Sequence, residues 1–326
     1  MWKTLIRVNK KLTIAIPIML VAGFLFGSVV EQSFTKNLKS FIMPLTFLMV
    51  YPMMVTLNIN HLLQGLKNVK LQVVTQLINF TVIPLIAYVL GLLFFPDQPY
   101  LALGLLLAAL LPTSGMTISW TGFAKGNMGA AINMTIIGLT LGSLATPFYV
   151  MALLGAKVDV NIVMVMKQIL YIVFIPMVLG IATRQYLLKK YSQPVFKKDI
   201  APRFPALSTI GVLGIVFVAM ALKAKTIVSE PSLLLSIFIP LLIIYGLNFT
   251  LSTLIAKCTF NRGDGIALVY GTVMRNLSIA LAIAINAFGE AGANAALVIA
   301  VSYIIQVQSA AWYVKFTDNI FGPAEA

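Results

Sequence analysis

The chain has 326 residues, of which 60% are apolar and only 10% are charged. A soluble domain is about half apolar and about one quarter charged, so this composition excludes an ordinary water-soluble fold. Lysine and arginine outnumber aspartate and glutamate by 23 to 9. Because most of these charges fall in short connections between apolar segments, they indicate membrane topology and argue against a nucleic-acid partner.

Ten segments are apolar and long enough to cross a hydrocarbon core about 30 Å thick, which takes about 20 helical residues. In chain order they cover residues 12–30, 40–57, 71–95, 100–124, 129–153, 161–186, 205–222, 233–256, 264–287 and 290–316. We therefore predict an all-α, multi-pass integral membrane protein with about ten transmembrane helices, embedded in a lipid bilayer.

Basic residues between these segments predict the orientation of the chain. With a cytoplasmic N-terminus, sixteen basic residues lie on the inner side and five on the outer side. Cytoplasmic loops of membrane proteins carry an excess of lysine and arginine. We therefore expect a multi-pass protein of the cell (plasma) membrane with both termini on the cytoplasmic side.

The longest connection, residues 187–204, contains five basic residues and two prolines and is predicted to be a cytoplasmic linker. Before it, residues 1–186 hold the five spans of a first repeat and the sixth span. After it, residues 205–326 complete the second repeat. We expect one membrane-embedded unit.

A shift of 163 residues, half the chain length, places AKGNMGAA at 124–131 on AFGEAGAN at 287–294. Small residues at such positions also suit close helix packing in lipid, which leaves coincidence open as the simpler interpretation. Each half has five spans, however, and consecutive halves with an odd number of spans must be oppositely oriented. Two inverted five-helix repeats are a common plan of secondary transporters.

The fourth span is interrupted by Pro112, Thr113, Ser114 and Gly115 before the apolar pattern resumes through Thr117. Proline lacks a backbone donor and glycine weakens a helix, so backbone groups are released at mid-membrane depth. Protein, water, an ion or a substrate must bond these groups. The alternative is a simple proline kink.

Under the same shift, Arg275 of the ninth span falls on Pro112, which predicts a second interrupted helix opposite the first. A guanidinium near the bilayer centre is costly and is expected to face a cavity or a partner. Arg275 can contact an anionic substrate, replace a coupling cation, or act as a structural clamp on broken backbone. We include its neighbours Met274, Asn276 and Ser278 in the predicted transport site.

Further polar residues within the spans can line an ion site or polar cavity, or merely join helices. They include Asn79, Thr135, Asn294 and Gln306. Asn294, Ser302 and Gln306 are separated by multiples of four and so follow one face of a helix.

Residues for metal or enzyme chemistry are scarce in this chain. The single histidine, His61, and the single cysteine, Cys258, form no zinc-type ligand cluster, and we predict no metal and no cofactor. The spans contain neither a cluster of acids nor a nucleophile with a base. This argues against the rival interpretation, a membrane-embedded lipid-modifying enzyme. A channel or a structural membrane subunit stays open as a third interpretation.

The segments PTSGMTISWTGFAKGN, from Pro112, and GTVMRNLSIALAIAINAFG, from Gly271, resemble the bile acid:sodium symporter superfamily, which includes arsenical-resistance permeases of the Acr3 type. The resemblance covers essentially the whole chain. It implies ten spans in panel and core subdomains, two broken crossing helices that bind the substrate, and alternating access.

The sodium-coupled members are similar to this chain at Thr135 and at the Asn79-Phe80 pair. Their serine–asparagine pair of the fourth span falls on Thr117-Ile118. The acidic sodium ligand falls on Gly271 and the adjacent glutamine on Arg275. Sodium needs hard oxygen ligands, so the family's sodium site is largely replaced and the coupling ion stays open.

The arsenite-transporting branch is similar to this chain at Trp120 and at residues 124–126. Its characteristic cysteine falls on Thr113, and its ninth-span glutamate has no counterpart near Asn276. The resemblance therefore does not carry over a thiol-based site.

From the residues and the resemblance together we predict a secondary transporter of a small solute, an organic or inorganic anion, by alternating access. The alternative is an arsenite or oxyanion efflux permease of the Acr3 type. The sequence alone sets no oligomeric state.

Overall fold

The structure, a computed structural model, describes residues 2–31, 37–56, 68–158, 161–289 and 291–323. Within these ranges the secondary structure consists of helices, without strands, so the predicted all-α class is confirmed. His61 and the ends of two predicted spans, residues 57 and 290, lie outside the described residues.

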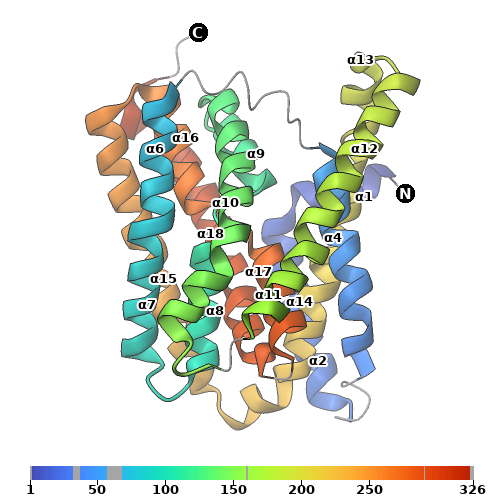
Figure 1. Ribbon diagram of the computed structural model, residues 1–326, viewed down its shortest axis with the longest axis vertical. Coiled ribbons are helices and arrows are strands. Elements are labelled where there is room, and N and C mark those ends of the chain that lie inside the picture. Colours follow the sequence, from blue (N-terminus) through green and yellow to red (C-terminus); the bar gives the residue numbers. More distant parts are fainter. Residues whose placement is uncertain (1, 32–36, 57–67, 159–160, 290, 324–326) are drawn as a thin grey trace. The chain divides into compact units, whose positions relative to one another are not determined.

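The helices follow the predicted apolar segments closely (Figure 1). The first half contains α1 (Trp2–Lys10), α2 (Leu12–Val29), the 3₁₀ turn η1 (Leu38–Phe41), α4 (Ile42–Thr56), α6 (Val69–Leu77), the π-helical turn η3 (Ile78–Val82), α7 (Ile83–Phe94), α8 (Pro99–Leu110), α9 (Gly115–Phe123) and α10 (Met128–Leu154). The second half contains α11 (Ile162–Ile169), the π-helical turn η4 (Leu170–Phe174), α12 (Ile175–Lys190), α13 (Gln193–Val195), the π-helical turn η5 (Phe196–Ile200), α14 (Arg203–Ser229), α15 (Ser232–Thr259), α16 (Arg262–Val273), α17 (Leu277–Phe288) and α18 (Gly292–Phe321).

Among the described residues, six helical stretches are long and apolar enough to cross a membrane, and four more apolar helices are shorter. The fourth and ninth predicted spans are each divided, into α8 with α9 and into α16 with α17. The chain is a multi-pass membrane protein.

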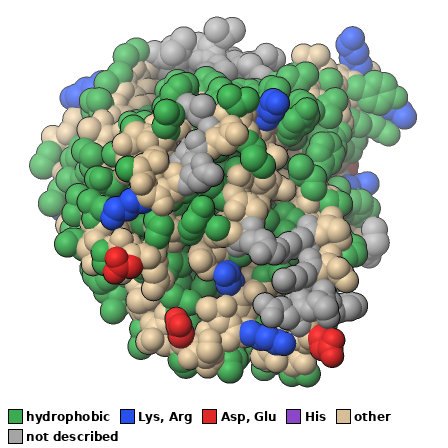
Figure 2. Space-filling view, turned by 60° about the horizontal axis from the view of Figure 1, so that its bottom comes forward, with side chains coloured by type: hydrophobic (Ala, Val, Ile, Leu, Met, Phe, Trp, Pro, Cys, Tyr) green, Lys and Arg blue, Asp and Glu red, His purple; other side chains and the backbone are tan. Residues whose placement is uncertain are grey.

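Exposed side chains agree with a lipid environment. Along α2, Ile14, Ile18, Val21 and Leu25 are each more than half exposed and recur on one helical face. Figure 2 shows apolar side chains over the flanks of the drawn face, with charged side chains only at scattered points. Lipid tails solvate such a surface, whereas water would not.

The chain divides into two compact units, each made of several segments. Unit 1 contains Met1–Asn58, Asn161–Leu235 and Ser278–Ala300, and unit 2 contains Ile59–Val160, Ser236–Leu277 and Val301–Ala326. Each unit therefore takes segments from both halves of the sequence.

In unit 1, α14 packs along α2 and α4, and α12 packs on α4. Small residues make these contacts close. A Cβ atom at Gly27 would lie 2.2 Å from the Ala221 carbonyl oxygen, and one at Gly211 would lie 2.5 Å from the Met49 backbone nitrogen. Close backbone approach of this kind is how helices associate in lipid.

In unit 2, α10 lies alongside α8, α9, α16 and α6, while α7 packs on α8. The π-helical turn η3 interrupts the long helix from Val69 to Phe94. A π-helical turn leaves backbone groups without their usual helical partners. The Tyr149 hydroxyl of α10 donates to the Phe80 carbonyl in this turn.

Three helices of unit 2 begin around one carboxylate. Asn68, Asn127 and Asn261 cap α6, α10 and α16. The side-chain amides of Asn68 and Asn127 also donate to Asp264, at 2.6 and 2.7 Å. Helix N-termini carry partial positive charge, which this buried carboxylate offsets.

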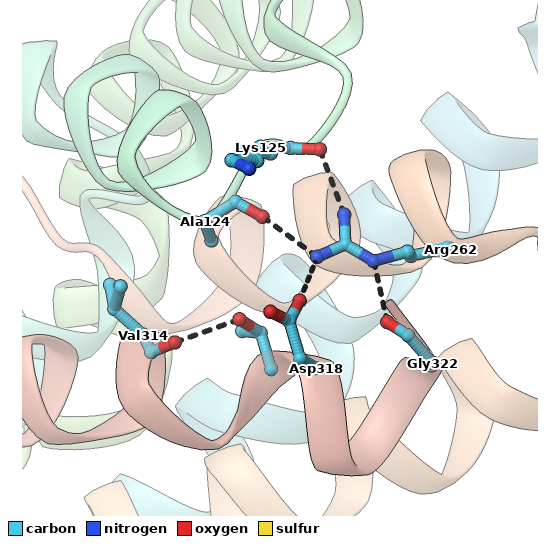
Figure 3. A network of polar contacts seen from close by, with 7 residues as sticks. Ala124, Lys125, Arg262, Val314, Asp318 and Gly322 are labelled. Atoms are coloured by element: carbon cyan, nitrogen blue, oxygen red, sulfur yellow. Dashed lines mark hydrogen bonds and ion pairs between the residues drawn. The ribbon is translucent and has the colours of Figure 1, made fainter. Parts of the chain in front are cut away.

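The neighbouring Arg262 joins the start of α16 to two other chain segments (Figure 3). Its guanidinium donates to the carbonyl oxygens of Ala124 and Lys125 after α9, at 3.4 and 3.0 Å. It also donates to the Gly322 carbonyl at 2.8 Å and forms an ion pair with Asp318 at 2.5 Å. These contacts hold the ends of α9, α16 and α18 together.

Candidate functional site

The breaks of the two divided helices meet inside unit 2. Pro112 and Arg275 form an isolated antiparallel bridge. The Thr113 amide donates to the Met274 carbonyl, and the Asn276 amide donates to the Leu111 carbonyl, each at 2.7 Å. Backbone groups that the breaks release at this depth therefore bond one another, as burial in an apolar medium requires.

The first break is shaped by residues within it. Thr113 has a φ of 63°, in the left-handed region that a β-branched residue rarely adopts. Its hydroxyl oxygen lies 2.6 Å from the Pro112 carbonyl and 3.3 Å from the carbonyl oxygens of Met134 and Thr135, which share its single proton as acceptors. Ser114 then caps α9, since its side chain accepts from Met116 and Thr117 bonds back to the Ser114 amide. These contacts restart the helix at Gly115.

The second break contains neither proline nor glycine, and a neighbouring helix holds it. The Arg275 amide donates to the Gln306 side-chain oxygen of α18 at 2.8 Å, and the Gln306 side-chain nitrogen donates to the Arg275 carbonyl at 3.2 Å. Gln306 thus supplies both bonds that a helical neighbour would supply. The Tyr245 hydroxyl donates to the Gln306 side-chain oxygen at 3.0 Å, which orients Gln306. The same hydroxyl lies 2.9 Å from the Ser302 hydroxyl.

The Arg275 side chain is buried, with 3% of its surface exposed. Its Nη1 donates to the Ala109 carbonyl at 3.1 Å, in the last turn of α8. Its Nη2 has no hydrogen-bond partner among the described residues. The last carbonyls of a helix carry partial negative charge, so the guanidinium also meets a favourable dipole there.

A cavity of about 20 Å³ adjoins Arg275. It is lined by Ile83, Leu105, Ala108, Ala109, Leu241, Ile244, Tyr245, Asn248, Arg275 and Ser302. The volume fits about one water molecule. No carboxylate is among the lining residues, so the charge of Arg275 is not balanced by an acid there.

A second polar cluster holds the helix before the break. Asn248 of α15 donates to the Thr272 carbonyl at 2.9 Å, and Ser252 contacts both Asn248 and the Thr272 hydroxyl. On another side, Asn79 donates to the Gly271 carbonyl at 3.0 Å. The end of α16 is therefore bonded from two neighbouring helices.

The structure brings together most of the site residues that the sequence predicts. Pro112, Thr113, Ser114, Gly115, Thr117, Met274, Arg275, Asn276, Asn79, Thr135 and Gln306 all belong to unit 2. Thr135 bonds its own helix at Ala131 and lies 3.5 Å from the Ser114 carbonyl. Ser278 and Asn294 belong to unit 1, and both are half-buried.

Sequence reasoning missed Tyr245, Asn248, Ser252 and Thr272. For the first three, the available signal was a set of polar side chains in α15, which is otherwise apolar, whereas Thr272 lies in α16. Cys258 lies on the same helix, in its last turns, and is exposed.

A model of the Sodium Bile acid symporter family matches residues 43–230 of this chain. Arsenical-resistance protein Acr3 of Corynebacterium glutamicum is 24% identical over 304 residues, which cover 86% of this chain and 82% of that protein. The uncharacterized transporter slr0944 of Synechocystis is 23% identical over 335 residues, covering 93% and 86%. Sodium/bile acid cotransporter 7 of Xenopus tropicalis is 25% identical over 238 residues, covering 69% and 66%.

Proposed function

Since the chain belongs to the Sodium Bile acid symporter family and is a secondary transporter, we propose that its cargo is a small anion moved by alternating access. The single observation that carries this proposal is the buried charge of Arg275 at the crossing of two broken helices, with no acid among the described residues that line its cavity. The proposal includes no catalysis, no cofactor and no nucleic acid.

The charge of Arg275 favours an anionic cargo for an electrostatic reason. In a medium of low dielectric constant, a buried cation lowers the energy of nearby anions more than it would in water. An anionic group about 8 Å from the guanidinium would be stabilised by roughly 2 kcal/mol at an effective dielectric constant of about 20. Direct contact in the cavity of this conformation is restricted by its volume of about 20 Å³.

Arg275 has a second role in this proposal, as a built-in cation. Its bond to the Ala109 carbonyl neutralises the C-terminal end of α8, where a dissociable cation would otherwise be favoured. Arg275 can serve both as a clamp and as a charge that favours anions. Its Nη1 bonds the Ala109 carbonyl, and its Nη2 has no hydrogen-bond partner among the described residues. A sodium ion at this crossing would be repelled by the guanidinium.

The proposed architecture has ten spans in two inverted halves, with both termini on the cytoplasmic side of the plasma membrane. The charge distribution of the connections and the two matched helix breaks support it. In alternating access, panel and core subdomains would move relative to each other around the crossing.

The test begins with a thermal-shift screen of purified protein against organic carboxylates and inorganic oxyanions, followed by counterflow of the stabilising anion in proteoliposomes. Arg275→Gln should reduce counterflow roughly tenfold or more, the equivalent of about 1.4 kcal/mol. Arg275→Lys should retain more activity than Arg275→Gln because it keeps the charge. Arg7→Gln, at an exposed position of α1, is the matched control and should transport normally.

Full counterflow and unchanged anion affinity in a folded Arg275→Gln protein would sink the anion-selective role. A screen in which only cations or neutral solutes stabilise the wild-type protein would overturn the choice of cargo.

A second candidate is efflux of arsenite or a related oxyanion, because similarity to two Acr3 proteins spans most of the chain. Thiol ligation at the crossing is not part of this candidate. Thr113 occupies the break and its hydroxyl bonds carbonyl groups, while Cys258 is exposed in α15. Expression in arsenite-sensitive cells should raise arsenite tolerance if this candidate is right. Unchanged tolerance, with the protein present in the membrane, would count against it.

A further inference from the structure

The connection between α12 and α14 is rich in positive charge. Residues 189–203, here named the basic elbow, carry one acid, Asp199, and five basic residues: Lys189, Lys190, Lys197, Lys198 and Arg203. All five basic side chains are exposed. Figure 1 shows α13 directly beyond the end of α12, and both belong to unit 1.

The basic elbow is folded and anchored. Phe196 is buried, with 1% exposed, and the Arg184 guanidinium lies 5.3 Å from its ring centre. Arg184 also donates to the Thr56 carbonyl at the end of α4. The Ala201 amide bonds the Phe196 carbonyl at 2.8 Å, closing the π-helical turn η5. The backbone that carries Lys189 and Lys190 before Phe196, and Lys197 and Lys198 after it, is therefore held in place by these contacts.

The charges of the elbow are not neutralised within the described part of the chain. None of the five basic groups forms a salt bridge there. Lys190 lies over the Tyr191 ring at 5.7 Å, and Arg203 lies over the Trp2 ring at 5.8 Å. Ring contacts leave the positive charge in place, so the clustered groups repel one another.

Helix dipoles explain only part of this pattern. Lys189 and Lys190 lie in the last turn of α12, where a cation is favourable. Lys197 and Lys198 come just before α14, and Arg203 is its first residue. A cation at the start of a helix opposes the dipole, so the dipole of α14 does not account for these three residues.

The apolar and aromatic residues of the same region suit a membrane interface. Tyr186, Tyr191 and Val195 are exposed by 63, 38 and 40%. Tyrosine is enriched where the hydrocarbon core meets the headgroups, and lysine extends from there toward phosphate. The elbow connects α12 and α14, both of which belong to candidate membrane spans.

We propose that the basic elbow binds the phosphate groups of anionic phospholipids at the membrane surface. Anionic headgroups would neutralise the clustered lysines, and the exposed tyrosines and Val195 would contact the adjoining acyl chains. This binding is independent of the cargo and of Arg275. If anionic lipids bind the basic elbow, the stability of unit 1 and its orientation in the membrane should depend on the lipid composition.

The test uses the full chain in phosphatidylcholine nanodiscs with increasing fractions of phosphatidylglycerol of the same acyl chains. The thermal unfolding midpoint of wild-type protein should rise with phosphatidylglycerol. In Lys197→Gln/Lys198→Gln, the rise produced by a given fraction of phosphatidylglycerol should be several-fold smaller. The matched control, Lys167→Gln/Lys225→Gln, removes two exposed lysines from the same unit outside the elbow and should respond like wild type.

A second measurement uses Trp2, which contacts Arg203. Brominated phosphatidylglycerol should quench its fluorescence more than brominated phosphatidylcholine does, with Trp2→Phe protein identifying the share of the signal from Trp2. The Lys197→Gln/Lys198→Gln protein should lose this preference. The proposal would be overturned if that variant kept the wild-type preference for brominated phosphatidylglycerol. It would also be overturned if inorganic phosphate alone raised the unfolding midpoint of wild-type protein as much as phosphatidylglycerol does.

Discussion

The two helix breaks of unit 2 are bonded to each other but are built differently. The first break contains Pro112, the left-handed Thr113 and the capping residue Ser114, so its own residues define its geometry. The second break has no such residues around Arg275, and the Arg275 amide and carbonyl take their bonds from Gln306 on α18.

This difference separates a break that is intrinsic to its segment from one that depends on its surroundings. The first break would persist if its neighbours moved, because proline and a capped helix start exclude a continuous helix. The second would lose both hydrogen bonds of the Arg275 backbone if α18 moved. We therefore expect the second break to be the more adjustable part of the crossing, and it is the part that carries the charge.

The largest expected effect comes from removing the external support of the second break. Gln306→Leu leaves the Arg275 amide and carbonyl without partners in a buried place, and it also removes one of the two hydrogen-bond partners of the Tyr245 hydroxyl. Unsatisfied buried groups cost about 1–3 kcal/mol each, so unfolding free energy should fall by roughly 3 kcal/mol. Denaturant or thermal unfolding in micelles measures this, and counterflow should fall with it.

Asn319→Leu is the control for Gln306→Leu, because Asn319 is exposed on the same helix. It should alter stability by less than about 0.5 kcal/mol. Equal losses in the two variants would mean that Gln306 does not hold the second break.

An intermediate effect is expected from crowding the first break. A Cβ atom at Gly142 of α10 would lie 2.8 Å from Pro112 Cδ, so Gly142→Ala should cost roughly 1–3 kcal/mol. Adding Pro112→Ala removes the clashing atom and should restore part of the loss in the double variant. Additive losses in this double-mutant cycle would show that the clash is not the cause.

The smallest effect concerns the backbone of Thr113. Both Thr113→Ala and Thr113→Gly lose the hydroxyl contacts, but only glycine adopts a φ of 63° without steric cost. Thr113→Gly should therefore be about 1 kcal/mol more stable than Thr113→Ala by thermal or denaturant unfolding. If the alanine variant were as stable as the glycine variant, the first break would not depend on the left-handed conformation.

The sequence predicts the fold well where local rules decide. Apolar length indicates where the helices lie, and Pro112 with Gly115 indicates the first break. The second break was predicted because of the charge of Arg275 and its alignment with Pro112. In the structure these two aligned residues lie next to each other and form an antiparallel bridge.

Tertiary contacts explain what the sequence could not predict. Tyr245 and Asn248 lie on α15, and nothing in their spacing indicates which backbone they bond. The clamp contact of Arg275 to Ala109 joins residues 166 positions apart. From the sequence, the role of Arg275 stays open between clamp and charge, because only the packed structure assigns its donors individually.

The contacts of Arg262 bear on how this chain can be engineered. Because the guanidinium bonds the Gly322 carbonyl and Asp318, the segment through Gly322 acts as a structural part of unit 2. Affinity tags and fluorescent fusions should therefore leave the segment through Gly322 intact and be joined through a flexible spacer. Deleting residues from Asp318 onward would release Arg262 from two of its bonds, so a shortened expression variant is a poor choice for crystallisation.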